Sequence, residues 1–410
     1  MSSSFDEQLE AEVEVLRPAT GGGVARMPDG RVVFVRGALV GERVRIAVRE
    51  IGARFLRAEV LEVRDASAQR VRPPCPYARP GGCGGCDLQH ADPIAQRDWT
   101  AALVSEHLRR IAHIERVVTV VPAPSPARGS RTRLRAAVDA DGLLGLRRYR
   151  SHDVEPLTTC WLADERLGAA FSHPWPDAVE VELRALGSVP LAVVRHGDGT
   201  TSVRDLDGRP WRGSPVARVA VGDLHYEVSP TSFWQSHVDA PSILTQRVLA
   251  FADLDAGDRV VDLYSGVGLF ALAVARVVGS RGRVVALESS PSAVRDARVN
   301  LEGSPRASVR ASAVSPRSLG AAVEAGDVVI LDPPRTGLGR GVAAALAGRD
   351  PSRLVYVSCD AATFARDVKE FLESGFSVGE LEVHELFPMT EHVELVAVLD
   401  RSRTGRDSST

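Results

Sequence analysis

Five cysteines are the residues of this 410-residue chain with the most distinctive chemistry, and they divide into four plus one. Cys83 and Cys86 are separated by two residues in a glycine-rich loop, Cys75 lies just upstream, and Cys160 follows much later. Four thiolates suit either a tetrahedral zinc ion or an iron–sulfur cluster, and their chemistry alone does not separate the two. Because the count is odd, a disulfide framework is not expected, and unligated cysteines are the remaining alternative.

The fifth cysteine, Cys359, follows the apolar segment 354–358 and precedes a helix predicted over residues 362–372. A cysteine at such a strand-to-helix junction feels the positive end of the helix dipole, which lowers the thiol pKa and favours the thiolate. A thiolate there is a candidate for covalent catalysis, whereas the alternative is an inert buried cysteine. A carboxylate suited to the role of a general base, Glu394, stands at the entrance of the last apolar strand.

The elements that must position these groups begin with residues 258–270. An apolar run there indicates a buried parallel strand, which ends at Asp262 and Tyr264 and leads into Gly266 and Gly268. A helical pattern follows, so this is the first unit of a doubly wound α/β sheet, where ligands lie beyond the carboxyl ends of the strands. The glycines let the backbone approach a bound nucleotide. Many such turns serve packing only, which is the alternative.

Two acidic residues follow at the ends of later strands. The strand predicted over 283–287 ends in Glu288, which is placed to bind ribose hydroxyls, and the strand over 327–331 ends in Asp332. The dinucleotide fingerprint is incomplete, because Ala271 stands where its third glycine would fall. Two acids and a Gly-x-Gly turn resemble a class I methyltransferase, in which S-adenosylmethionine occupies the crevice.

The preceding residues divide into a barrel and a middle domain. Residues 9–66 alternate apolar and polar between turn signals, which predicts a small β-barrel. Its glycine and valine pattern resembles a TRAM domain, an OB-like RNA-binding barrel, and a purely structural barrel is the alternative. The amphipathic helix over 94–113 is expected to pack on the catalytic domain. The expected domains are the barrel at 1–66, a mostly antiparallel α+β domain with the four-cysteine site at 67–228, the Rossmann-like domain at 229–402 and a disordered tail at 403–410. The Rossmann-like domain is the expected catalytic domain.

Net charge counts against a nucleic-acid enzyme, since the formal value is −3. Lys369 is the only lysine, however, so nearly all positive charge is arginine, the better fork for phosphate. Arg131, Arg133 and Arg135 alternate and would share one face of a strand, as a patch for an RNA backbone or as a solvated face. With no long apolar run and no signal peptide, we expect a cytoplasmic protein without a membrane partner.

Five motifs in a fixed order resemble the RNA uracil-5-methyltransferase family, and the resemblance covers nearly the whole chain. The four cysteines and the barrel resemble the 23S rRNA members that carry a [4Fe–4S] cluster, rather than the shorter tRNA members that lack both. The motifs are Phe233-Trp-Gln235, Asp262-Leu-Tyr264-Ser-Gly-Val-Gly268, Asp332-Pro-Pro-Arg335, Val357-Ser-Cys359 and Phe387-Pro-x-Thr-x-His-x-Glu394.

The resemblance implies methyl transfer from S-adenosylmethionine to C5 of a uridine, with 23S rRNA preferred. It implies a covalent adduct between Cys359 and C6 of the uracil, with Glu394 as the base. The enzyme is expected to be a monomer and to bind RNA. A tRNA T-loop uridine and a non-catalytic role in RNA binding or ribosome assembly are the alternatives. The cofactor contacts expected from the motifs are Gln235, Tyr264, Gly266, Gly268, Glu288 and Asp332.

Two departures from the family pattern stand out. Seven residues separate Cys75 from Cys83, where five are expected of the family. Asp360-Ala361 follows Cys359, where the family reads Asn-Pro, and this removes an amide able to position the pyrimidine.

Overall fold

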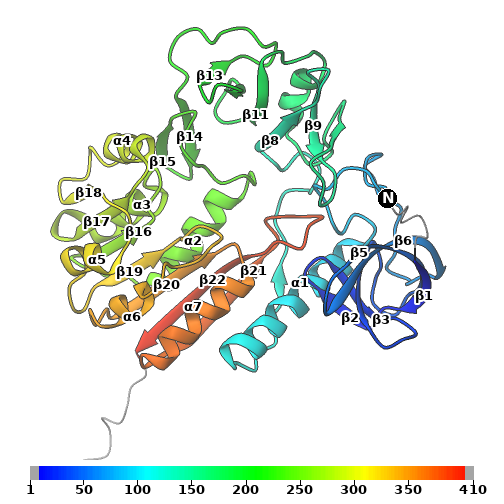
Figure 1. The fold of residues 1–410 in the computed structure, drawn as a ribbon. Coiled ribbons are helices and arrows are strands. Elements are labelled where there is room, and N and C mark those ends of the chain that lie inside the picture. The colour runs from blue at the N-terminus through cyan, green and yellow to red at the C-terminus, as the bar shows by residue number, and fades with distance from the viewer. Residues whose placement is uncertain (1–8, 402–410) are drawn as a thin grey trace, which may run out of the picture.

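The N-terminal part of the molecule is a curled six-stranded sheet (Figure 1). The computed structural model describes residues 9–401, so the expected disordered tail at 403–410 lies outside the described residues. The sheet has the order β1-β5-β6-β4-β3-β2, and alternate residues of its strands fill one small apolar core. Its strands are β1 (Glu10–Glu14), β2 (Arg17–Ala19), β3 (Gly22–Arg26), β4 (Val32–Arg36), β5 (Arg43–Ile51) and β6 (Phe55–Asp65).

A long helix follows the cysteine loop, as the sequence predicts. Asp92 caps α1 (Pro93–His107) by accepting a hydrogen bond from the Ala95 N–H at 2.8 Å, and a π-helical turn, η1 (Leu108–Ala112), extends it. Val104 and Leu108 of this helix are buried in the same core as Phe364 from the catalytic domain. The helix therefore packs on the catalytic domain.

The middle domain is a second six-stranded sheet in which every pair is antiparallel, with the order β10-β9-β8-β11-β12-β13. A short helix, η2 (Glu165–Phe171), covers part of its core. A separate hairpin, β14 (Ala217–Val221) with β15 (Leu224–Val228), packs on the catalytic domain through Tyr226 and Val228. The sheet strands are β8 (Arg133–Val138), β9 (Leu144–Arg147), β10 (Val154–Pro156), β11 (Ala178–Arg184), β12 (Leu191–His196) and β13 (Thr201–Arg204).

The catalytic domain contains an eight-stranded sheet of order β18-β17-β16-β19-β20-β22-β21-β7. Five neighbouring strands, β18 to β20 in this order, are parallel, and β22 runs antiparallel to both of its neighbours. The strands are β7 (Val120–Val121), β16 (Arg259–Leu263), β17 (Arg283–Glu288), β18 (Ala307–Ala311), β19 (Val328–Leu331), β20 (Arg353–Ser358), β21 (Phe376–His384) and β22 (Glu394–Arg401).

Helices cover both faces of this sheet, which explains the nearly continuous apolar runs of its central strands (Figure 1). The α/β fold class is thus confirmed, and β7 adds an edge strand from a segment expected in the middle domain. Within residues 9–401 no helix has the length and apolarity needed to cross a membrane. The helices are α2 (Ala240–Ala252), α3 (Leu269–Val278), η3 (Gly279–Arg281), α4 (Pro291–Asn300), α5 (Pro316–Ala322), α6 (Val342–Ala347) and α7 (Ala361–Glu373).

Candidate active site and four-cysteine site

One edge of the eight-stranded sheet gathers the predicted catalytic groups. Tyr264, Asp332 and Cys359 follow the carboxyl ends of the parallel strands β16, β19 and β20. Glu394 reaches the same edge because β22 runs the other way. Its second residue, Leu395, pairs with Ser358, the last residue of β20, so the first residue of β22 lies beside Cys359.

The thiol of Cys359 is not activated by the helix that follows it, so that prediction is wrong. Burial, together with the carboxyl groups of Glu394 and Asp332, raises its pKa to about 12, although the guanidinium of Arg335 acts in the opposite direction. The first turn of α7 is already satisfied, since Asp360 accepts a hydrogen bond from the Thr363 N–H at 2.8 Å. The family departure at Asp360 thus serves as a helix cap.

The acidic groups of the site are held in surroundings that favour their neutral forms. Burial and the nearby Asp332 raise the pKa of Glu394 well above its usual range. Burial raises the pKa of Asp332 to about 7, and Asp262 adds to the effect. Asp262 is fully buried with a pKa of about 7, although the Ser265 hydroxyl donates to it at 2.7 Å and the Ala271 N–H at 3.1 Å. Like charges this close suppress one another's ionisation.

The glycine turn after β16 has the shape of a nucleotide-binding turn. Gly266 and Gly268 have φ angles of 57° and 86°, and Tyr264 between β16 and the turn has a φ of 62°. Glu288 at the end of β17 accepts a hydrogen bond from the Gly266 N–H at 2.8 Å. The other Asp262 oxygen, Oδ1, is buried without a hydrogen-bond partner among residues 9–401. The turn, Asp262 and Glu288 therefore form one unit that fits the crevice expected for the cofactor.

Gln235 approaches the site from the segment that precedes α2. This segment is joined to the middle domain, because the Thr132 N–H donates to the Ser236 carbonyl at 2.8 Å and the Val238 N–H donates to the Ser130 carbonyl at 2.9 Å. Gln235 is buried, whereas the neighbouring Phe233 is 54% exposed. The segment is thus held against the middle domain by its main chain, and the expected contact of Gln235 with the cofactor stays a prediction.

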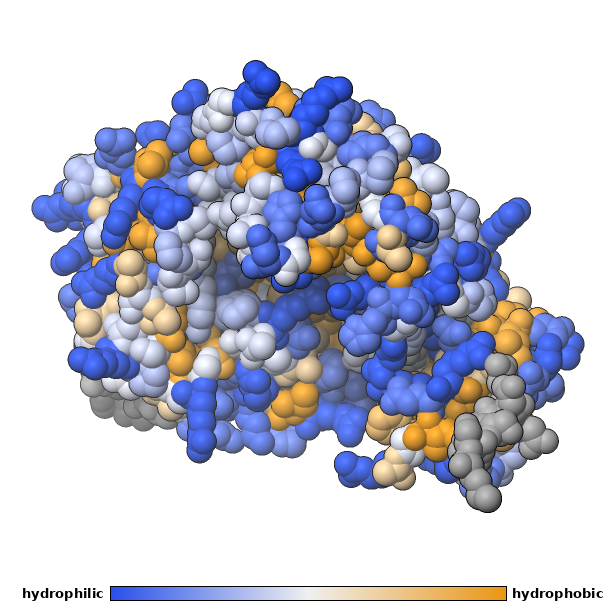
Figure 2. All heavy atoms as spheres, turned by 45° about the horizontal axis from the view of Figure 1, so that its top comes forward, coloured by the Kyte–Doolittle hydropathy of each residue, from blue (hydrophilic) through white to orange (hydrophobic). Residues whose placement is uncertain are grey.

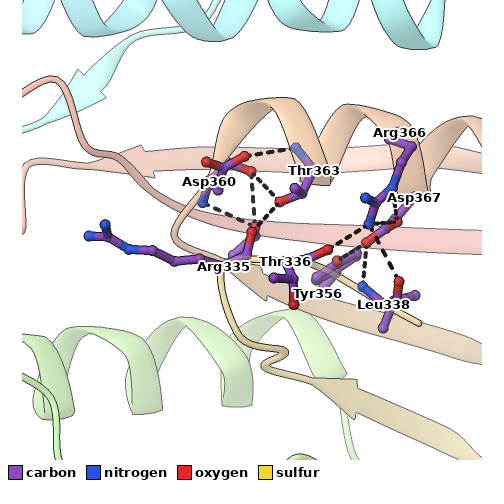
Figure 3. Close-up of polar contacts among 9 residues, drawn as sticks. Arg335, Thr336, Leu338, Tyr356, Asp360, Thr363, Arg366 and Asp367 are labelled. Carbon is purple, nitrogen blue, oxygen red and sulfur yellow. Dashed lines mark hydrogen bonds and ion pairs between the residues drawn. The ribbon is translucent and has the colours of Figure 1, made fainter. Parts of the chain in front are cut away.

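The loop after β19 is fixed to α7 by a set of polar contacts (Figure 3). Asp367, itself buried, accepts hydrogen bonds from the Leu338 N–H and the Tyr356 hydroxyl, both at 2.7 Å. The Thr363 hydroxyl donates to the Arg335 carbonyl at 3.2 Å. The side chain of Arg335 extends away from these contacts (Figure 3). Its proximity to Cys359 was missed at the sequence level, although the Asp-Pro-Pro-Arg motif contains it.

The four remaining cysteines line one cavity between the cysteine loop and the middle domain. A Cβ on Gly85 would lie 2.9 Å from Leu146 Cδ1 and 3.5 Å from Cys83 Sγ, so the glycine keeps this cavity open. Within residues 9–401 no group of three or more His, Cys, Asp or Glu side chains is arranged to hold a metal ion. The donor set and the shared cavity nevertheless fit a group held by four thiolates. The cysteines, all partly buried and free, are Cys75, Cys83, Cys86 and Cys160.

The three predicted RNA-binding arginines have different surroundings. Arg131 lines the four-cysteine cavity. Arg133 makes a bidentate pair with Glu182 at 2.7 Å for both contacts, and Arg135 lies 3.5 Å from the same carboxylate and is more exposed. The charge of the strand face is therefore partly neutralised, which the alternation of arginines does not reveal. Figure 2 shows a hollow in the middle of one face of the molecule, with largely hydrophilic walls.

Known proteins resemble this chain over almost its whole length. A family model for tRNA (Uracil-5-)-methyltransferase matches residues 215–402, and a TRAM domain model matches residues 7–61. An uncharacterized RNA methyltransferase of Streptomyces coelicolor is 40% identical, with 97% of this chain and 94% of that protein covered. The 23S rRNA (uracil(1939)-C(5))-methyltransferase RlmD of Chromohalobacter salexigens is 31% identical, with 95% and 89% covered.

A solved structure also matches the whole fold. It is the tRNA (uracil-54, C5)-methyltransferase of Pyrococcus abyssi in complex with S-adenosyl-L-homocysteine. The two chains are 25% identical and superpose with a TM-score of 0.68, with 94% of this chain and 100% of the other covered.

Proposed function

The chain belongs to the family of S-adenosylmethionine-dependent RNA uracil-5-methyltransferases, and from this premise we propose that its substrate is a uridine of 23S rRNA. The whole-length similarity to a 23S rRNA methyltransferase supports this choice over tRNA, as does the four-cysteine site between the cysteine loop and the middle domain. A tRNA T-loop uridine is the second candidate, because the solved structure of similar fold is a tRNA enzyme.

Cys359 is the nucleophile and Glu394 the base in the proposed mechanism. The observation that carries it is the antiparallel β22, which places Glu394 against the strand end that presents Cys359. The sulfur adds to C6 of the uracil, and the electron pair of the C5–C6 double bond makes C5 nucleophilic. S-adenosylmethionine supplies the methyl group that C5 accepts. Glu394 then removes the C5 proton, the double bond re-forms, and the C6–sulfur bond breaks to release Cys359 as the thiolate.

The reaction requires Cys359 and Glu394 to give up protons that the free protein holds. Of the charged groups that set the pKa of Cys359, Arg335 favours the thiolate and the two carboxyl groups oppose it. A neutral Glu394 therefore assists the attack, because an ionised carboxylate would raise the pKa of the thiol further. Once Cys359 is bonded to carbon it carries no charge, and Glu394 can ionise and serve as a base.

The cofactor contacts form the other half of the proposal. Glu288 and the turn at Gly266 and Gly268 bind the nucleoside part, because backbone without Cβ atoms allows close approach and the carboxylate suits ribose hydroxyls. Tyr264, Gln235 and Asp332 border the reacting end. Asp332 is near both Asp262 and Glu394, and a positively charged sulfonium bound beside it would favour its ionised form.

A [4Fe–4S] cluster held by Cys75, Cys83, Cys86 and Cys160 has a structural role in this proposal. Methyl transfer involves no electron transfer, so the cluster is not needed for the chemistry itself. The chain after Cys86 is hydrogen-bonded to the loop between β21 and β22, here called the catalytic loop. The N–H groups of Asp87 and Leu88 both donate to the Met389 carbonyl at 2.9 Å. Binding a cluster would therefore fix the loop that leads to Glu394.

The proposal is tested by methylation of defined RNAs in vitro. The purified protein is incubated with 23S rRNA and with tRNA from cells that lack its gene, and the methylated uridine is mapped in each. We expect C5 methylation of a 23S rRNA uridine by the wild-type protein and none by Cys359→Ala. Methylation confined to the tRNA T-loop would overturn the substrate, and full activity of Cys359→Ala would overturn the covalent mechanism.

A further inference from the structure

The catalytic loop between β21 and β22 is held from outside at several residues, and Met389 is the one whose main chain is held by two other segments. Its φ of 65° lies in the left-handed region, which residues with a side chain rarely adopt. Both of its main-chain polar groups are bonded to other parts of the chain. Its carbonyl accepts the two N–H groups that follow Cys86, and its N–H donates to Oε1 of Gln96 at 2.9 Å.

The side chain of Gln96 is fixed in the orientation that binds the Met389 main chain. It is only 5% exposed, and it projects from the first turns of α1. Its Nε2 donates to the Ala91 carbonyl at 2.9 Å and lies 3.3 Å from the Met389 sulfur. Both ends of the amide are therefore engaged, and this fixes the side chain in one orientation.

From Met389 a short series of hydrogen bonds leads to Glu394. The Thr390 hydroxyl donates to the Phe387 carbonyl at 2.8 Å and accepts the His392 N–H at 3.2 Å. Val393 is buried in the apolar core, and Glu394 begins β22. The contact between Gln96 and Met389, here called the clamp, lies five residues before Glu394. The hydrogen bonds of Thr390 and the burial of Val393 restrict the chain between the clamp and the carboxyl group.

We propose that Gln96 is a positioning residue for removal of the C5 proton, because it fixes the loop that places the Glu394 carboxyl group beside Cys359. The inference rests on the proposed role of Glu394 as the base. In that step the C5–H bond breaks, the proton passes to Glu394, the C5–C6 double bond re-forms, and the Cys359 thiolate leaves. A displaced carboxyl group slows this step while the earlier attack by Cys359, which directly follows β20, proceeds.

The test compares four variants on an RNA substrate and on the same RNA with 5-fluorouridine at the target. Gln96→Met removes the amide at similar length, and Glu394→Gln removes the base. Arg97→Met is the matched control, since Arg97 is the next residue of α1 and joins it to Glu385 at 3.1 Å, outside the clamp. Fluorine at C5 cannot leave as a proton, so the rate of trapping reports only the earlier steps.

We expect turnover of Gln96→Met to fall by about 100-fold, the scale of a misplacement of about 1 Å at a reacting group. The variant should accumulate a covalent adduct with normal uridine RNA, as Glu394→Gln should, and should trap the fluorinated RNA at close to the wild-type rate. Gln96→Glu keeps an acceptor for the Met389 N–H and should recover part of the turnover. Arg97→Met should behave as wild type in all three measurements.

Two outcomes would overturn the inference by itself. Turnover and trapping of Gln96→Met that fall together would mean that the residue supports only the fold, and unchanged turnover would mean that the clamp is dispensable. If Glu394→Gln traps fluorinated RNA but accumulates no adduct with uridine RNA, Glu394 is not the base, and both the proposed mechanism and the role of Gln96 fail.

Discussion

Glu391 joins the barrel to the catalytic loop, and its charge should make that contact sensitive to pH. Its Oε2 accepts the Gly21 N–H, from the turn between β2 and β3, at 2.7 Å. Burial and the nearby Asp87 raise the pKa of Glu391 to about 7, although the hydrogen bond from the Gly21 N–H and the guanidinium groups of Arg36 and Arg57 act in the opposite direction. The carboxyl group is therefore neutral below pH 7 and charged in poorly hydrated surroundings above it.

The magnitude follows from the difference between the folded and unfolded pKa. A rise from the ordinary value of 4.5 to about 7 corresponds to about 3 kcal/mol, at about 1.4 kcal/mol for each tenfold change in proton affinity. The folded state holds the proton more tightly, so this stabilisation is fully present below pH 4.5 and is lost as the pH rises through 7. Glu391→Gln keeps an acceptor for Gly21 without the charge.

The variant should match the wild type near pH 5 and be more stable near pH 8. Hydrogen exchange of the peptide that contains residues 17–26 measures the contact, because opening of the barrel from the loop exposes the Gly21 N–H. At pH 8 exchange in Glu391→Gln should be slower by up to about 100-fold, the equivalent of about 3 kcal/mol. Glu12→Gln is the control, since it removes an exposed ion pair of the same barrel with Arg43.

A contrary result would be decisive. If Glu391→Gln speeds the exchange of this peptide at pH 8, the carboxylate is ionised there and stabilised by Arg36 and Arg57. The argument that burial outweighs these two guanidinium groups would then be wrong.

Three further predictions concern the other sites. Since the pKa of Cys359 is about 12 in the free protein, its alkylation by iodoacetamide should still be accelerating at pH 10, and a plateau near neutral pH would show a preformed thiolate. Protein purified without oxygen should contain iron and inorganic sulfide, which serine at the four cavity cysteines should abolish; zinc alone would refute the cluster. Arg135→Ala should lower the salt slope of RNA binding by about one, and Arg133→Ala by less because Glu182 already neutralises it, whereas unchanged slopes would make this a solvated face.

Apolar periodicity predicted the elements of the catalytic domain well. The runs ending at Asp262, Glu288 and Asp332 became β16, β17 and β19, because a strand covered on both faces must be apolar almost throughout. The comparisons confirm the family that the ordered motifs indicate. Four of the five motifs lie at the end of a parallel strand or just before β22, where one sheet edge gathers them, whereas Phe233-Trp-Gln235 lies between β15 and α2.

Electrostatics could not be predicted in the same way. The helix after Cys359 is local and visible in the sequence, but the pKa of the thiol is raised chiefly by burial in the folded protein, and then by Glu394 and Asp332, which follow or begin other strands. The pairing of Arg133 with Glu182 likewise joins two strands that are 49 residues apart. A local pattern identifies the residue type, whereas its charge state depends on burial and on distant partners.

The loop before β22 is the point at which the three parts of the molecule meet. Gly21 of the barrel binds Glu391, the cysteine loop binds the Met389 carbonyl through Asp87 and Leu88, and α1 binds the Met389 N–H through Gln96. Each contact falls within the residues that lead to Glu394, on the antiparallel strand that brings this residue to Cys359. The parts that precede the catalytic domain in the sequence thus hold the residues that lead to Glu394, the proposed base. Hence the catalytic domain by itself should retain the cofactor crevice at Gly266 and Glu288, but should lose the support that aligns Glu394.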